Sequence, residues 1–166
     1  LVPVGRYIGL FIHRAERSLV CCGLVAMACT IQVAVRVRPP AAGDSSSITV
    51  DSSGVTIAGS SQHTYASDIV TGSDQRACFD AVAARLLRKL ADGFSCTLLA
   101  YGQTGSGKTH TMFGPPGCLT EASLDGLAAG TCAPAWGVLP RAAMALLSGL
   151  PANAKMHASA IEVYQE

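Results

Sequence analysis

The sequence contains little charge and no excess of either sign. Of its 166 residues, 14% are Asp, Glu, Lys or Arg, and the formal net charge is +1. A balance this even gives no general attraction to nucleic acid. A charged fraction this low predicts either that part of the surface is covered by other polypeptide or that the folded unit is incomplete. The hydrophobic fraction of 49% is that of a globular chain, and the length suits one domain.

The sequence also lacks paired cysteines and internal repeats. Its seven cysteines form no C-x-x-C pair and are odd in number, which does not favour a disulfide framework or a motif built on that spacing. We interpret them as reduced thiols, packed as small apolar side chains in a cytosolic protein.

Residues 1–30 have a pattern of their own. Arg6, Arg14 and Arg17 precede the apolar stretch LVCCGLVAMAC (19–29), an outline that resembles a secretory signal. The stretch is too short to span a membrane unless it includes the residues after it. We expect instead a poorly ordered N-terminal extension and no association with a membrane.

The residues after 30 predict a strand, small hairpins and a helix. IQVAVRVRPP (31–40) alternates large apolar side chains with smaller or polar ones and ends in two prolines, which predicts a strand over residues 31–38. The polar, turn-rich residues 43–66 predict small antiparallel hairpins. Ser73 is expected to cap a helix that runs from residue 74 to about residue 91, with Gly93 after its end.

The second half of the chain continues this alternation. FSCTLLA (94–100) is an apolar run of strand length, which predicts a strand buried on both faces. A connector rich in Gly, Ala and Pro (114–136) carries Trp136, the only tryptophan, and an exposed insertion is the simplest interpretation of it. Residues 138–147 predict a helix, and residues 155–166 predict a final strand. The whole pattern indicates an α/β fold with a mostly parallel central sheet flanked by helices.

The stretch AYGQTGSGKTHTMFG (100–114) contains the clearest motif. Within it, GQTGSGKT (102–109) matches G-x-x-x-x-G-K-[ST] at every fixed position. The motif follows the predicted buried strand and precedes a predicted helix, which is the context of a phosphate-binding P-loop. The sequence therefore predicts a P-loop NTPase with a nucleoside triphosphate site; an ordinary glycine-rich surface loop is the alternative.

The residue types of this loop suit a triphosphate. Its glycines let the backbone curl and point N–H groups inward, and the following helix adds the positive end of its dipole. Lys108 is expected to reach the β- and γ-phosphates, and Thr109 to ligate the Mg²⁺ that bridges them. The predicted nucleotide-binding residues of the loop are Gly102, Gln103, Thr104, Gly105, Ser106, Gly107, Lys108 and Thr109.

The residues that flank the loop resemble the signature of the kinesin motor family. Ala100 and Tyr101 before the loop and THTM (109–112) at its end are similar to that family's residues, and RVRP (36–39) resembles its R-x-R-P motif. Weaker similarities follow in the family's order at YASDIV (65–70), Gln75, Phe79 and Asp80, GVLPR (137–141) and IEVYQE (161–166). The resemblance covers residues 31–166, and the loop and RVRP are its most specific parts.

The resemblance implies further roles and partners. Arg36 and Pro39 would flank the adenine, Arg38 would support them, and His110 would contribute its ring from the other side. The ligands would be ATP and Mg²⁺, the partner would be the microtubule, and the location would be the cytoplasm and its cytoskeleton. For Arg36 and Arg38, a solvated strand end is the alternative.

Two motifs of the kinesin pattern do not occur in the sequence. These are N-x-x-S-S-R-S-H and D-L-A-G-S-E, which sense the γ-phosphate in that family. We therefore expect residues 31–166 to be part of a truncated motor domain that does not hydrolyse ATP alone, and we assign no catalytic residue. Two alternatives are a non-motile nucleotide-binding or remnant interaction module and an unrelated P-loop enzyme, the second of which RVRP disfavours.

Overall fold

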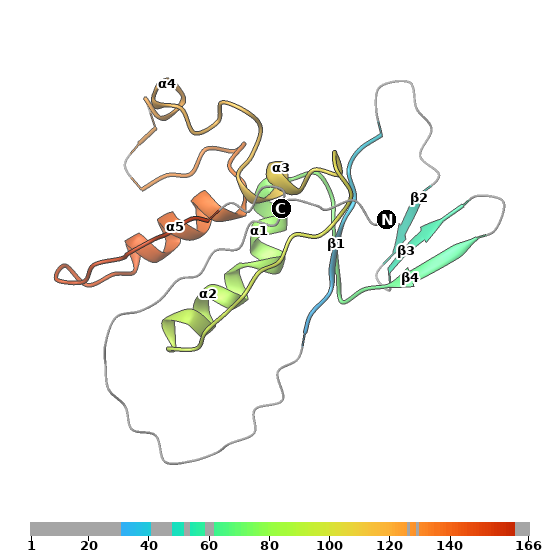
Figure 1. Ribbon diagram of the computed structural model, residues 1–166, viewed down its shortest axis with the longest axis horizontal. Coiled ribbons are helices and arrows are strands. Elements are labelled where there is room, and N and C mark those ends of the chain that lie inside the picture. The colour runs from blue at the N-terminus through green and yellow to red at the C-terminus, as the bar shows by residue number, and fades with distance from the viewer. Residues whose placement is uncertain are drawn as a thin grey trace, which may run out of the picture.

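The computed structural model describes residues 31–40, 48–51, 54–58, 62–125, 127–128 and 130–161. Helices occupy one side of the described chain, and a small antiparallel sheet projects from the other (Figure 1). The expected N-terminal extension (1–30) and the end of the expected final strand (162–166) lie outside the described residues.

The strand predicted over residues 31–38 is present but shorter. It is β1 (Ala34–Arg36), and it pairs in parallel with β5 (Ile69–Thr71), with Ala34 opposite Ile69 and Arg36 opposite Thr71. The residue just before the strand is held by the carboxylate of Asp68, which accepts a hydrogen bond from the Val33 N–H at 2.7 Å. Arg38 and the two prolines lie beyond the strand, because proline has no N–H to donate to a ladder.

The hairpins predicted over residues 43–66 are confirmed for the described part. Three strands, β2 (Ile48–Asp51), β3 (Gly54–Ile57) and β4 (His63–Ala66), form an antiparallel sheet in chain order. The turn between the first two is supported by Asp51 Oδ1, which accepts from the Gly54 N–H at 3.0 Å. Threonine side chains pair across the other two strands, with 3.0 Å between the hydroxyls of Thr56 and Thr64.

The helix predicted from residue 74 is confirmed in position but divided at Ala83. It forms α1 (Gln75–Val82) and α2 (Ala84–Ala91). Ala83 keeps a right-handed helical backbone, its N–H donates to the Phe79 carbonyl, and its carbonyl accepts from the Leu87 N–H. The two helices therefore follow one another with little interruption.

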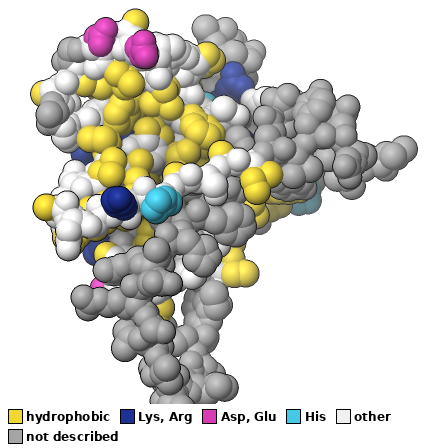
Figure 2. Space-filling model, turned by 60° about the vertical axis from the view of Figure 1, so that its left-hand side comes forward, with side chains coloured by type: hydrophobic (Ala, Val, Ile, Leu, Met, Phe, Trp, Pro, Cys, Tyr) yellow, Lys and Arg dark blue, Asp and Glu magenta, His cyan; other side chains and the backbone are white. Residues whose placement is uncertain are grey.

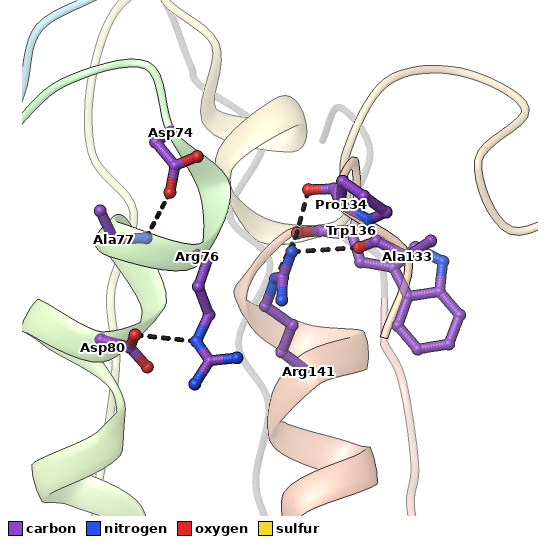
Figure 3. Close-up of polar contacts among 8 residues, drawn as sticks. All are labelled: Asp74, Arg76, Ala77, Asp80, Ala133, Pro134, Trp136 and Arg141. Carbon is purple, nitrogen blue, oxygen red and sulfur yellow. Dashed lines mark hydrogen bonds and ion pairs between the residues drawn. The ribbon is translucent and has the colours of Figure 1, made fainter. Parts of the chain in front are cut away.

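The cap predicted at Ser73 is wrong by one residue. Asp74 is the N-cap, and its Oδ1 accepts from the Ala77 N–H at 2.6 Å (Figure 3). One turn later, Arg76 donates to Asp80 at 2.8 Å on the exposed side of α1. This hydrogen bond, and then the negative charge of Asp80, raise the pKa of Arg76 above its usual value.

Three further helices come after the loop. They are α3 (Lys108–Met112), the short α4 (Glu121–Leu124) within the connector, and α5 (Val138–Ser148), which confirms the helix predicted there and ends at Gly149. The hydrophobic core lies where α1 and the Ala83 junction meet α5. Its buried members are Cys78, Phe79, Ala83, Val138 and Ala142.

The strand predicted at residues 94–100 is wrong for this structure. These residues have no strand conformation, and Phe94 and Leu99 are 44% and 63% exposed. Neither sheet of the described chain includes them, and a strand is stable only where a neighbouring edge satisfies its N–H and C=O groups. Residues 155–161, also predicted as strand, are irregular for the same reason. The described residues thus form one parallel pair and one antiparallel sheet in place of a mostly parallel central sheet.

Candidate nucleotide-binding site

The glycine-rich loop folds back on itself before α3. The Ser106 N–H donates to the Gln103 carbonyl at 3.2 Å, and Gly107, the N-cap of α3, has a φ of 97° that side chains with a Cβ rarely adopt. Gly102 has a φ of 154°, which residues with a Cβ also rarely adopt, and a Cβ there would lie 2.6 Å from Ser106 Oγ. Two of the fixed glycines are therefore required by the shape of the loop itself.

Lys108 is the first residue of α3, and its side chain turns back over the loop. Its Nζ donates to the Gly102 carbonyl at 2.7 Å and to the Gln103 carbonyl at 2.9 Å. The ammonium group therefore lies at the mouth of the loop. Its long side chain and three donors let it exchange these carbonyls for phosphate oxygens without moving the helix.

Arg36 ends β1 and is held by four hydrogen bonds. Its Nε and Nη2 donate to the carbonyls of Gly72 (3.1 Å) and Ser73 (2.6 Å). Its Nη1 donates to Gln75 Oε1 at 2.9 Å and to Thr111 Oγ1 at 3.0 Å. Because guanidinium donors lie in the plane of the group, these contacts occupy its edges and leave its faces for stacking.

A pocket of about 520 Å³ joins the two sequence motifs. Arg38 crosses between them, since its Nη1 donates to the Gly105 carbonyl of the loop at 3.0 Å. The pocket has the size of a small-molecule site. It is lined by Arg36, Val37, Arg38, Pro39, Ser73, Ser106, Gly107, His110 and Thr111.

The structure thus brings together six of the predicted site residues and leaves the others outside this pocket. Arg36, Arg38, Pro39, Ser106, Gly107 and His110 line it, whereas Gly102, Gln103, Thr104, Gly105, Lys108 and Thr109 do not. A smaller cavity of about 180 Å³ includes Lys108 in its lining, together with Arg36, Ser106 and Gly107. Thr109 is exposed in the first turn of α3.

Sequence reasoning missed Gln75 as a residue of the site. It is 6% exposed, accepts from Arg36, and donates through Nε2 to the His110 carbonyl at 2.8 Å. The only signal in the sequence was its place among the weaker family similarities. Thr111 lies in THTM (109–112) but was also missed as a residue of the site, although its hydroxyl accepts a hydrogen bond from Arg36.

Hydrogen bonds hold the last residues of the connector beside the site. Arg141 of α5 is 5% exposed and donates to the carbonyls of Ala133, Pro134 and Trp136 (Figure 3). The carbonyl of Ala135 accepts from Gln75 Nε2 at 3.3 Å instead. Trp136 is buried, and its Nε1 donates to the Cys118 carbonyl at 3.1 Å. The interpretation of the connector as an exposed insertion is therefore wrong for this end of it, which is packed.

The start of α3 offers a cationic donor, Lys108, and a hydroxyl group, Thr109, which are residue types that a magnesium triphosphate would use. Within the described residues, no three His, Cys, Asp or Glu side chains lie together as a metal site. A Mg²⁺ ion bound there would depend on hydroxyl, water and phosphate oxygens, which is its usual coordination at nucleotides. Among the described residues, no helix has the length and apolar content that crossing a bilayer requires.

Comparison with known proteins gives a consistent result. The family model described as the kinesin motor domain matches residues 31–166. The chain is 40% identical to the Kinesin-like protein KIP1 of Saccharomyces cerevisiae over 113 residues, which is 64% of this chain and 10% of that protein. It is 37% identical to the Kinesin-like protein cut7 of Schizosaccharomyces pombe over 112 residues, 62% of this chain and 9% of that protein.

A third relative matches over a longer stretch. The chain is 30% identical to the Kinesin-like protein KIN-12A of Arabidopsis thaliana over 148 residues, which is 82% of this chain and 11% of that protein. In each comparison the aligned region is about a tenth of the relative's length.

Proposed function

The chain belongs to the kinesin motor domain family, and from this membership we propose that it binds ATP with Mg²⁺ between the glycine-rich loop and residues 36–39. Kinesin motor domains are P-loop NTPases that act on microtubules. The observation that carries the proposal is the pocket that Arg36, Arg38 and Pro39 share with Ser106, Gly107 and His110. It combines flat side chains with residues of the glycine-rich loop.

In this proposal each part of the site holds a different part of the nucleotide. The loop from Gly102 to Gly107 surrounds the phosphates with backbone N–H groups, and Lys108 leaves its carbonyl partners for phosphate oxygens. The faces of Arg36 and Pro39 lie on one side of the adenine and His110 on the other. Arg38 keeps the loop near this wall through Gly105.

Thr109 is the protein group proposed to hold Mg²⁺. It is exposed in the first turn of α3, directly after Lys108, where a hydroxyl can reach an ion bound to the phosphates. The ion would neutralise phosphate charge and keep the triphosphate in one geometry.

For the whole protein we propose a motor that couples ATP hydrolysis to movement along microtubules, in the cytoplasm and on the cytoskeleton. The 166 residues contain neither of the two γ-phosphate-sensing motifs of the family. Catalysis of phosphoryl transfer depends on positioning and charge stabilisation, so we expect this chain alone to bind ATP and to turn it over negligibly. The alternative is a nucleotide-binding module that does not move.

Titration of a fluorescent ATP analogue with Mg²⁺ tests the proposal. We expect binding by the unaltered chain and a loss of at least about tenfold in affinity for Lys108→Ala, which corresponds to roughly 1.4 kcal/mol. Lys155→Ala is the matched control, because Lys155 is an exposed lysine outside the loop, and it should bind normally. Equal affinities of both variants would reject the site.

A steady-state ATPase assay on the same samples separates the candidates. Negligible turnover beside clear binding fits a site that needs further protein groups. Turnover at an ordinary enzymatic rate by these 166 residues would contradict our account and indicate an independent P-loop enzyme.

A further inference from the structure

Gln75 joins three segments that are far apart in the sequence. It is the first residue of α1, and its Oε1 accepts from Arg36 Nη1 at 2.9 Å. Its Nε2 donates to the carbonyl of His110 at 2.8 Å and to that of Ala135 at 3.3 Å. One buried amide therefore connects the end of β1, the helix after the loop and the end of the connector.

The orientation of this amide is determined by the chemistry of its partners. A guanidinium group can only donate, and backbone carbonyls can only accept. Rotating the amide by half a turn would set its NH₂ against Arg36 and its oxygen against two carbonyl oxygens. Only the observed orientation satisfies all three contacts.

The start of α1 fixes where the amide lies. Because Asp74 caps the helix through the Ala77 N–H at 2.6 Å, Gln75 is held in the first turn. The side chain of Gln75 is buried against Arg36, while that of its neighbour Arg76 is exposed. The cap and the helical backbone together place the side chain of Gln75 next to Arg36.

We propose that Gln75 is a positioning residue that keeps the plane of the Arg36 guanidinium facing the base of the bound nucleotide; this inference rests on the function proposed above. Gly72, Ser73 and Thr111 accept the other hydrogen bonds from Arg36. Gln75 is the acceptor that α1 contributes. Without this acceptor, one N–H of the half-buried Arg36 guanidinium has no hydrogen-bond partner. The group can recover a hydrogen bond by turning towards water. The adenine then loses its stacking contact with the guanidinium plane, while binding of the phosphates by the glycine-rich loop is unaffected.

The test compares two probes on the full chain. Calorimetry gives the affinities for Mg-ATP, which has a base, and for Mg-tripolyphosphate, which has none. The ratio of the two should fall about tenfold in Gln75→Met, the effect expected for one hydrogen bond to a charged group. Gln62→Met changes an exposed glutamine before β4 and should leave the ratio unchanged. A general loss of structure would weaken both probes and would not alter the ratio in this selective way.

A double-mutant cycle shows whether Gln75 acts through Arg36. In an Arg36→Ala background, Gln75→Met should change the ratio no further, because the group that it positions is gone. Independent, additive effects of the two substitutions would overturn the proposal. So would an unchanged ratio in a folded Gln75→Met.

A third variant keeps the test decisive if Gln75→Met does not fold. Gln75→Asn keeps an amide at this position but shortens the side chain by one methylene, so its oxygen should no longer reach Arg36 Nη1 and the ratio should again fall. A folded Gln75→Asn with an unchanged ratio would contradict the proposed role. If the unaltered chain binds neither probe, the nucleotide function itself fails, which is distinct from a failure of Gln75 to position Arg36.

Discussion

At the scale of single residues, the two arginines Arg36 and Arg38 differ in how firmly they are held. Arg36 donates to four acceptors from the segment before α1, from α1 and from α3. Arg38 is exposed and donates to the Gly105 carbonyl at 3.0 Å. Arg36 is thus part of the wall of the pocket, whereas Arg38 links that wall to the loop.

This difference predicts a modest role for Arg38. Arg38→Ala should reduce ATP affinity by about fivefold, because one solvent-accessible hydrogen bond contributes roughly 1 kcal/mol. Melting temperature should hardly change, since no buried group is left without a partner. Calorimetric titration with Mg-ATP checks the affinity, and a loss as large as that of Lys108→Ala would assign Arg38 a direct phosphate contact instead.

At the scale of elements, α1 positions the site through its first turn. Its cap, Asp74, precedes Gln75, and its inner face adds Cys78 and Phe79 to the core. The short exposed pair of Arg76 and Asp80 lies on the opposite side, where solvent screens it. The helix therefore depends more on its cap and its buried face than on its ion pair.

Removal of the cap should lower stability measurably. Asp74→Ala leaves the Ala77 N–H without its side-chain acceptor and should reduce the free energy of unfolding by about 1 kcal/mol. Asp92→Ala is the matched control at the other end of the helical pair, where a negative charge opposes the helix dipole; it should be neutral or slightly stabilising. Urea denaturation followed by circular dichroism compares them, and equal losses would remove the capping argument.

At the scale of the whole molecule, apolar surface is the main feature outside the site. Hydrophobic side chains gather on one face with few charges among them (Figure 2). Leu119, Leu124, Leu147 and Leu150 are each at least 36% exposed. Exposed apolar surface promotes association with other chains.

A charge placed at an exposed leucine should reduce self-association. Leu147 lies on α5 and is 50% exposed, so Leu147→Lys should reduce self-association while changing stability by no more than about 0.5 kcal/mol. Ala142→Lys on the buried side of the same helix should destabilise the chain by more than about 2 kcal/mol, because it places a charge in the core. Sedimentation velocity and thermal denaturation distinguish the two effects. Greater self-association of Leu147→Lys would contradict this interpretation.

How far the sequence predicts the fold depends on whether a signal is local. Turn residues and helical periodicity lie within a few residues of one another, so the hairpins and α5 could be predicted. The apolar run at 94–100 indicates burial, but strand formation also needs a partner edge, which a local pattern cannot supply. Ser73 and Asp74 are both good caps, and only the observed geometry selects Asp74.

The same limit applies to the candidate site. The loop could be recognised from its own residues, whereas its closeness to residues 36–39 was implied only by family resemblance. Gln75 escaped detection because its partners lie 35, 39 and 60 residues away. A glutamine at the start of a helix is ordinarily exposed, and no local pattern marks this one as buried.

Photolabelling tests the central claim most directly. An azido derivative of ATP with its reactive group on the adenine ring would be bound with Mg²⁺, illuminated and located by mass spectrometry. We predict adducts within residues 36–39 or at His110, and their loss when excess ATP competes. Adducts confined to the apolar groove between α2 and α5, with none on either wall of the pocket, would contradict the account.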